Sequence, residues 1–294
     1  MNERDWLADR FEEQRGHLRA VAYRMLGSLS EADDAVQDAW LRASRAETDE
    51  VANLGGWLTT IVARVCLNRL RSRNRRREES LDAVLPDPVV RDAAAPQPEE
   101  EALMADSVGL ALLVVLDSLS PAERLAFVLH DMFDLPFEEI APMVGRTPAA
   151  ARQLASRARR RVRGSAVPEA DPDQARQREI VDAFFVAARD GDFEALVAVL
   201  HPDVVLRADF GRGRPGTGVV RGARAVAKQA RPVPGAVVQP ALVNGVAGAV
   251  ITLHGKPFAV MGFVVVDGRI VEIDAIADPA RLQRLAAHFT GGSW

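Results

Sequence analysis

Hydrophobic positions recur every three to four residues along the first half of the chain, which is the pattern of amphipathic helices. This periodicity runs over residues 6–77 and resumes over residues 101–163, and a stretch rich in proline and acidic residues separates the two segments. We therefore predict two helical units joined by an extended, solvated linker.

The pattern changes after a second break at residues 164–173. One more amphipathic segment, QARQREIVDAFFVAARDGDFEALVAVL, is followed by short β-type runs that glycine and proline separate. The turn Asp267-Gly268-Arg269 between FVVV and IVEI predicts a hairpin. The predicted fold class is multidomain, with two all-α units followed by an α+β unit. The predicted boundaries are 1–80 and 105–165 for the helical domains, 81–104 for the linker and 174–290 for the α+β domain.

The second helical unit ends in a sequence typical of a helix-turn-helix. In LPFEEIAPMVGRTPAAARQLASRARRRVRG, Gly145 ends a short helix, and Thr147 with Pro148 can begin the next one. Its outward side chains suit hydrogen bonds to phosphates and base edges in a DNA major groove, and a solvated basic face is the alternative. The residues expected in the core are Ala151, Leu154, Ala155, Ala158 and Val162, and those expected to face outward are Arg152, Gln153, Ser156, Arg157 and Arg160.

A second basic surface is predicted on the helix GGWLTTIVARVCLNRLRS and the residues after it. A basic helix with aromatic and asparagine neighbours can follow a phosphate backbone and catch a displaced base, and a solvated helix end is an equal alternative. The expected apolar stripe is Trp57, Ile61, Val65 and Leu67, and the basic stripe is Arg64, Asn68, Arg71 and Arg75.

The segment GSLSEADDAVQDAWLRA has the opposite charge. We expect Ser30 to cap its helix, with Asp33 in the first turn and an alanine-rich side buried. A solvated acidic face is the default interpretation, and a docking face for a basic partner is the alternative. The residues expected to face outward are Glu31, Asp34, Gln37, Asp38 and Leu41.

Composition narrows the class of protein. The 294 residues carry a net charge of -4, and 48% are hydrophobic, which is typical of a globular protein. The one cysteine, Cys66, excludes an intramolecular disulfide, and we expect it to be a buried apolar residue. No segment has the length of a membrane span or the features of a secretory signal, so we expect a cytoplasmic protein. We find no metal-ligand spacing or phosphate-binding glycine motif and expect no cofactor and no metal.

The ordered motifs of residues 5–165 resemble the two conserved domains of bacterial extracytoplasmic-function (group IV) RNA polymerase sigma factors. The resemblance implies that residues 31–41 dock on the clamp helices of the β′ subunit of core RNA polymerase. It also implies that residues 57–77 melt and read the minus-ten promoter element and that residues 147–163 read the minus-thirty-five element.

The last third of the chain resembles a SnoaL-like, NTF2-type cone, and a sigma factor with such a domain resembles the sigma-J-like subgroup. The stretches LPDP (85–88), ADFGRGRPG (208–216) and ADPARL (277–282) resemble motifs of this subgroup. The resemblance implies that the C-terminal domain regulates the sigma domains in cis. We expect its glycine-rich loop to contact the acidic face or the linker of the sigma domains. The loop residues concerned are Asp209, Gly211, Arg212, Gly213 and Arg214.

Two alternatives stay open for the cone. SnoaL-like domains can be isomerases or cyclases that use an acid or base in an apolar pocket. The candidates here are His201, Asp209, His254 and Asp274, of which Asp274 is the best if its side chain faces the cavity. A cone lined by phenylalanines can also bind a small apolar ligand without chemistry, as in a helix-turn-helix regulator that senses a small molecule. We favour a sigma factor that is not an enzyme.

Overall fold

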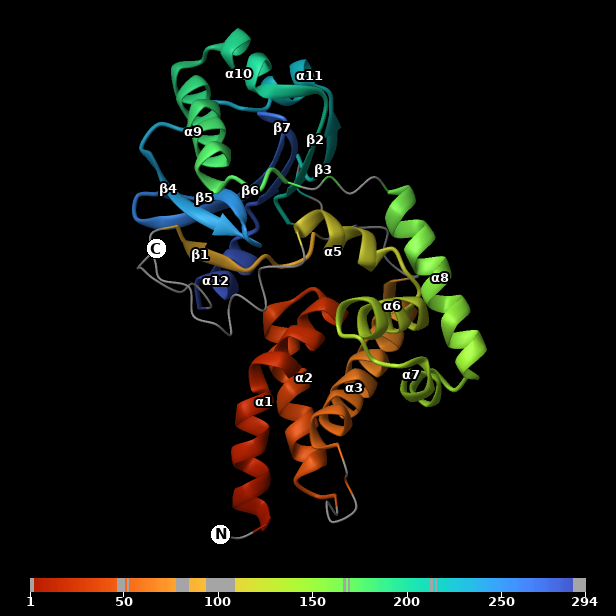
Figure 1. The fold of residues 1–294 in the computed structure, drawn as a ribbon. Helices are drawn as coiled ribbons and strands as arrows, with labels where there is room; N and C mark the ends of the chain where they lie inside the picture. The colour runs from red at the N-terminus through yellow and green to blue at the C-terminus, as the bar shows by residue number, and fades with distance from the viewer. Residues whose placement is uncertain are drawn as a thin grey trace. The chain divides into compact units, whose positions relative to one another are not determined.

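The structure is a computed structural model and describes residues 3–46, 51, 53–77, 85–93, 109–165, 168, 170–211, 214 and 216–287. The chain forms two compact units (Figure 1). The first unit comprises Met1–Leu81 and Gln97–Val167, and the second comprises Asp82–Pro96 and Pro168–Trp294. Both predicted helical domains therefore lie in one compact unit, and the domain boundaries themselves stay a prediction. No helix within the described ranges is long and apolar enough to cross a membrane.

The described part of the first unit is helical, as predicted. Helices α1, α2 and α3 pack against one another, α8 packs against α6 and α7, and α3 also contacts α6 and α7. Buried Cys66 lies on α3, and its burial raises the pKa of its thiol to about 12, which agrees with the prediction of an unreactive core residue. The elements are α1 (Glu3–Leu26), α2 (Leu29–Ala43), α3 (Leu54–Arg77), α5 (Leu110–Asp117), α6 (Pro121–Phe127), the π-helix η1 (Val128–Met132), α7 (Phe137–Val144) and α8 (Pro148–Gly164).

Local sequence explains where several of these helices begin and end. Gly145 ends α7 in the left-handed region (φ 66°), and Thr147 caps α8 with its side chain, as predicted for the helix-turn-helix. The cap of α2 differs from the expectation, because Ser28 and not Ser30 accepts the hydrogen bond from the amide of Glu31. Ser30 lies within the first turn because Leu29 is already helical.

The second unit is α+β, as predicted. Helices α9 and α10 pack beside a mixed sheet with the strand order β1-β4-β5-β6-β7-β2-β3 (Figure 1). Strands β2 and β7 pair in parallel and the other neighbours pair antiparallel. The elements are β1 (Val90–Asp92), α9 (Gln174–Asp190), α10 (Phe193–Val199), β2 (Leu200–Asp209), β3 (Gly218–Arg221), α11 (Ala223–Ala227), β4 (Ala236–Val243), β5 (Val246–Leu253), β6 (Lys256–Val266), β7 (Arg269–Ile276) and α12 (Pro279–Ala287).

The core of the second unit lies between these helices and one face of the sheet. The rings of Phe184 and Phe185 on α9 lie with centroids 5.3 and 5.6 Å from that of Phe263 on β6. The predicted hairpin is confirmed, because Asp267 and Gly268, both with positive φ, turn β6 into antiparallel β7.

The predicted solvated linker is wrong for residues 85–91, which are buried in the second unit. Residues Val90–Asp92 form strand β1 at the edge of the sheet, paired with Ala241–Val243 of β4. We call residues 85–92 the strap. Its proline and acidic residues look solvated in the sequence, whereas their burial depends on partners far along the chain.

Candidate functional site

Helix α8 presents the polar face that its sequence predicts. Ala151, Ala155 and Ala158 are buried, and Leu154 and Val162 are half-buried. The small alanine side chains let α8 lie close to α6 and α7. The five residues predicted to face outward are all exposed: Arg152, Gln153, Ser156, Arg157 and Arg160.

Two other arginines of α8 contact carboxylates of neighbouring elements. Arg159 donates to Asp131 of η1 at 2.5 Å, and Arg161 lies 3.4 Å from a carboxylate oxygen of Glu123 on α6. On the outward face, Arg157 lies 3.7 Å from the other oxygen of Glu123. The Arg152 guanidinium lies 5.2 Å from the ring centroid of Phe137 on α7. Periodicity correctly predicted the outward arginines, but it did not reveal which arginines have carboxylate partners, because those carboxylates lie on other helices.

Helix α3 carries an exposed basic stripe. Arg64, Asn68 and Arg71 are exposed and follow one another at helical spacing. Trp57 and Ile61 of the predicted apolar stripe are half-buried and lie in line with this basic stripe toward the start of α3, whereas Val65 and Leu67 are buried. The core side of α3 contains Leu58, Val62, Val65, Cys66, Leu67 and Leu70. The Arg75 side chain lies outside the described residues.

The acidic face of α2 is only partly turned to solvent. Asp34, Gln37 and Leu41 are exposed, as predicted, and Leu41 is 44% exposed although it is apolar. Glu31 and Asp38 are half-buried, which corrects the expectation for these two residues.

Two arginines of α3 account for this burial. Arg69 donates to Asp38 at 2.6 Å, and Arg73 lies 3.7 Å from Glu31. The basic charge of α3 is thus divided between an exposed stripe and a side that neutralises α2. This pairing leaves Asp34 as the most exposed of the acidic side chains on the predicted docking face.

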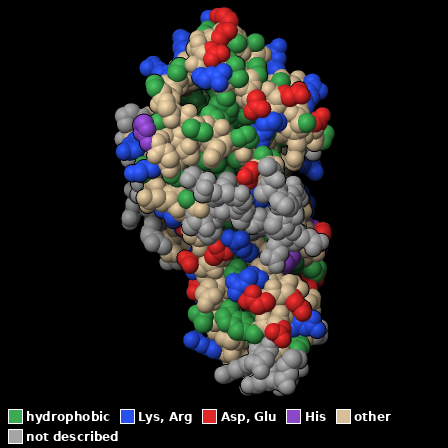
Figure 2. Space-filling model, turned by 90° about the vertical axis from the view of Figure 1, so that its left-hand side faces the viewer, with side chains coloured by type: hydrophobic (Ala, Val, Ile, Leu, Met, Phe, Trp, Pro, Cys, Tyr) green, Lys and Arg blue, Asp and Glu red, His purple; other side chains and the backbone are tan. Residues whose placement is uncertain are grey.

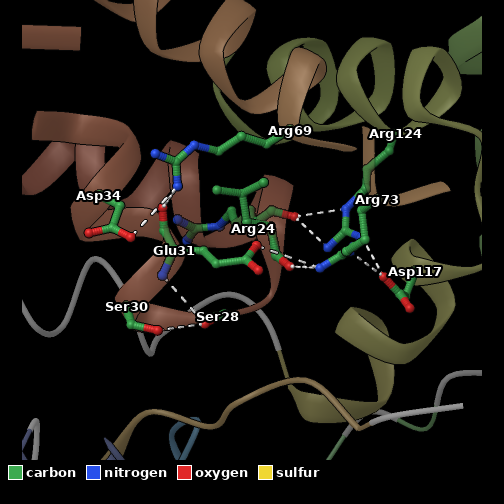
Figure 3. A network of polar contacts seen from close by, with 10 residues as sticks. Arg24, Ser28, Ser30, Glu31, Asp34, Arg69, Arg73, Asp117 and Arg124 are labelled. Carbon is green, nitrogen blue, oxygen red and sulfur yellow. Dashed lines mark hydrogen bonds and ion pairs between the residues drawn. The ribbon is translucent and has the colours of Figure 1, made fainter. Parts of the chain in front are cut away.

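A partly buried polar network joins the two helical segments of the first unit (Figure 3). Asp117 at the end of α5 accepts hydrogen bonds from Arg73 of α3 at 2.8 Å and from Arg124 of α6 at 3.0 Å. Arg124, whose side chain is 1% exposed, also donates to the carbonyl oxygen of Arg24 on α1 at 3.2 and 3.1 Å. Sequence reasoning missed this network, which is partly buried and links segments about one hundred residues apart.

In the second unit, the predicted regulatory loop is tied to the strap by one arginine. Arg281 of α12 donates to Asp87 of the strap at 2.9 and 2.6 Å and to Asp209 at 2.5 Å, and all three residues are buried. Asp209 also accepts from the amide of Gly211 at 2.9 Å, and Gly211 has a φ of 100°. Arg214 is exposed, and Arg212 and Gly213 lie outside the described residues.

Comparison with known proteins places these surfaces in a family. The family described as Sigma-70 region 2 matches residues 11–76, and the family described as Sigma-70, region 4 matches residues 109–162. The chain is 39% identical over 287 residues to the ECF RNA polymerase sigma factor SigJ of Mycobacterium tuberculosis, covering 92% of this chain and 91% of that protein. The chain belongs to the extracytoplasmic-function (ECF) sigma factors.

Two further matches extend along nearly the whole chain. The probable ECF RNA polymerase sigma factor SigI of M. tuberculosis is 32% identical and covers 99% of this chain and 100% of its own length. The crystal structure of SigJ superposes with a TM-score of 0.73 at 34% identity and covers 94% of this chain and 98% of that one. The ECF sigma factor relationship predicted from the sequence is therefore confirmed, and it includes the C-terminal α+β unit.

The region 2 match of this ECF sigma factor covers the described stripes of α2 and α3, and the region 4 match covers α8 as far as residue 162. The predicted surface residues, whose roles stay predictions, thus lie inside the matched regions. The loop, the strap and α12 lie outside both matches. Arg281 was not among the regulatory residues predicted from the sequence. The stretches LPDP and ADPARL, which contain Asp87 and Arg281, were singled out there.

The candidate acids and bases of the second unit do not gather in its core. Ile273 belongs to the core, so its neighbour Asp274 points to the opposite face of the sheet. There Asp274 accepts from Arg207 at 2.7 Å, and burial raises the pKa of Asp274 to about 6 although Arg207 opposes the shift. His254 is exposed in the turn between β5 and β6. Asp274 was the best candidate for a general base only if its side chain faces the cavity. Its side chain lies on the other face of the sheet, so this condition is not met.

Proposed function

We propose that this ECF sigma factor brings core RNA polymerase to promoter DNA through three separate surfaces. Helix α8 reads the minus-thirty-five element with its exposed face, and the stripe of α3 melts and reads the minus-ten element. The exposed part of α2, with Asp34, Gln37 and Leu41, docks on the clamp helices of the β′ subunit. The half-buried Glu31 and Asp38 contribute less to that docking than the sequence predicts, because α3 already neutralises them.

The outward face of α8 is the observation that supports DNA binding most strongly. Its arginines, glutamine and serine are exposed on one side of a capped second helix of a helix-turn-helix. On α3, the half-buried Trp57 leads into the stripe of Arg64, Asn68 and Arg71. An aromatic ring beside cationic side chains can stack on an unpaired base while the cations bind phosphates.

We further propose that the C-terminal domain restrains the factor in cis by capturing the strap. The strap belongs to the segment between regions 2 and 4, and pairing with β4, burial and the Asp87–Arg281–Asp209 triad hold it. The predicted loop acts on the linker through Arg281. A segment fixed in a sheet is not free to follow the sigma regions, so capture limits how far regions 2 and 4 can move apart.

The C-terminal domain has an apolar surface that suits a small apolar ligand, which we propose as its signal. Val238 of β4 is 41% exposed and pairs with Ile251 of β5, on the sheet face that holds the core. Figure 2 shows hydrophobic side chains around a hollow on this unit, at the top of the view. A titration with an environment-sensitive apolar dye tests this proposal, and Val238→Glu should weaken dye binding.

Run-off transcription tests the main proposal. The full chain and core RNA polymerase are incubated with DNA fragments that the chain itself has enriched, and transcripts are mapped. Arg152→Ala with Arg157→Ala should abolish promoter-specific transcripts, whereas Leu41→Ala should weaken binding to polymerase without changing binding to DNA. Absence of any specific transcript with the unmodified chain would contradict the proposal.

A further inference from the structure

Arg91 of the strap is buried, and no described residue forms an ion pair with it. It is 4% exposed, and among the residues that the structure describes its Nη1 and Nη2 atoms have no hydrogen-bond partner. Arg91 pairs with Leu242 of β4, and Leu242 pairs with Ala247 of β5, which belongs to the apolar core. Directly paired residues share a face of the sheet, so the Arg91 side chain lies on the core side.

Other buried or half-buried arginines of the same unit are paired. Arg281 lies between two carboxylates, and Arg207 between Asp274 and Glu272. Arg178 of α9, which reaches the sheet near Arg91, donates to the carbonyl oxygens of Gly248 and Ala241 at 3.0 and 3.1 Å. An unpaired charge removed from water costs free energy that packing does not return. Capture of the strap is thus opposed at Arg91.

The favourable contacts of the strap lie just before Arg91 in the chain, at Asp87 and Val89. The amide of Val89 donates to Oδ1 of Asn244 at 2.6 Å, and the amide of Asn244 donates to the carbonyl oxygen of Val89 at 2.8 Å. Asp87 binds Arg281. Release of the strap breaks these contacts but returns the Arg91 guanidinium to water.

We propose that Arg91 destabilises the captured strap and thereby keeps its capture by the C-terminal domain reversible. The consequence of this reversible capture for transcription rests on the proposed function, because only a strap that restrains the sigma regions needs to be released. The conformational equilibrium itself does not depend on polymerase or on promoter DNA. It is therefore measured on the full chain alone.

Hydrogen exchange at the amide of Val89 reports strap opening. Arg91→Met keeps an unbranched apolar side chain of similar volume and removes the charge, so the Val89 amide should exchange about tenfold more slowly than in the unmodified chain. Arg221→Met, at an exposed arginine of β3, is the matched control and should leave this rate unchanged. Equal or faster exchange in Arg91→Met would overturn the proposal.

A second variant tests the same charge without altering Arg91. Leu242→Glu places a carboxylate beside Arg91 on the neighbouring strand and should slow exchange at Val89. In a chain that also carries Arg91→Met, the same Leu242→Glu change should speed exchange, because the carboxylate is then the unpaired charge. The same direction of change in both backgrounds would overturn the proposal. Run-off transcription with Arg91→Met then tests separately whether tighter capture lowers transcript yield.

Discussion

At the scale of single residues, the partner of each arginine decides what it can do. On α8, Arg159 is held by Asp131, whereas the next residue, Arg160, is exposed and forms no ion pair within the described ranges. On α3, Arg69 neutralises Asp38 while Arg64 and Arg71 stay exposed. Exposed arginines such as Arg160 can neutralise phosphates directly, whereas Arg159 and Arg69 would first have to break an ion pair.

This division predicts different salt dependences for adjacent residues of α8. Arg160→Ala should weaken binding to promoter DNA and reduce the slope of log K against log salt by about 1, because one phosphate contact is lost. Arg159→Ala is the matched control, and it should leave the slope unchanged while lowering the stability of α8. Binding isotherms at several salt concentrations provide the slopes. Equal slopes for Arg160→Ala and the unmodified chain would remove Arg160 from the DNA surface.

Asp274 predicts an unusual pH dependence. Burial raises its pKa to about 6 from an ordinary 3.8. The folded state therefore binds more protons than the unfolded state between these values, and the stabilisation from protonated Asp274 is lost as the pH rises from 4 to 6. Relative to Asp274→Asn, the free energy of unfolding of the unmodified chain should fall by about 3 kcal/mol across this range.

Urea denaturation followed by the β-sheet signal in circular dichroism measures this difference, because every described strand lies in the second unit. Asp203→Asn, at an exposed aspartate of β2, is the control and should keep the pH slope of the unmodified chain. A pH-independent difference between the unmodified chain and Asp274→Asn would show that Asp274 titrates normally.

At the scale of elements, short-range signals in the sequence predicted more than long-range ones. Gly145 and Thr147 set the limits of α7 and α8 by local hydrogen bonds, and this helix-turn-helix was predicted correctly. The strap was missed because Asp87 is bound by Arg281, which is 194 residues away. Periodicity within one helix does not reveal such a partner. For the same reason, the outward face of α8 was predicted correctly and the paired residues of α2 were not.

The polar network of Arg73, Asp117 and Arg124, which joins α3, α5 and α6, leads to a prediction at this scale. Asp117→Asn removes the carboxylate that Arg73 and Arg124 share, and the Arg124 side chain is only 1% exposed. We expect a loss of about 1–3 kcal/mol in the stability of the first unit. Asp34→Asn removes a carboxylate whose side chain is 73% exposed and 3.9 Å from Arg69, and it should cost less than about 0.5 kcal/mol.

Urea denaturation followed by tryptophan fluorescence suits this test, because three of the four tryptophans, Trp6, Trp40 and Trp57, lie in the first unit. An equally small loss of stability for Asp117→Asn and Asp34→Asn would show that this polar network does not stabilise the first unit.

At the scale of the whole molecule, the strap is connected to the sigma regions along the chain but packs in the C-terminal domain. It belongs by sequence to the connection between regions 2 and 4, and by contact to the C-terminal sheet. Any free energy that holds it in the sheet therefore opposes movements of regions 2 and 4 that need this segment to be free. The Asp87–Arg281–Asp209 triad favours capture, and Arg91 opposes it.

Asp87→Asn tests this coupling in transcription. The change weakens the bond to Arg281 but leaves Asp209 to neutralise that buried guanidinium, so the domain should stay folded while the strap opens more often. A shift of about 0.7–1.4 kcal/mol toward release should raise the yield of run-off transcript roughly three- to tenfold when captured factor predominates. Asp203→Asn again serves as the control and should give the yield of the unmodified chain. Faster hydrogen exchange at Val89 without any rise in transcript would mean that the strap opens but does not restrain the sigma regions, and in-cis control would then have to act through another contact.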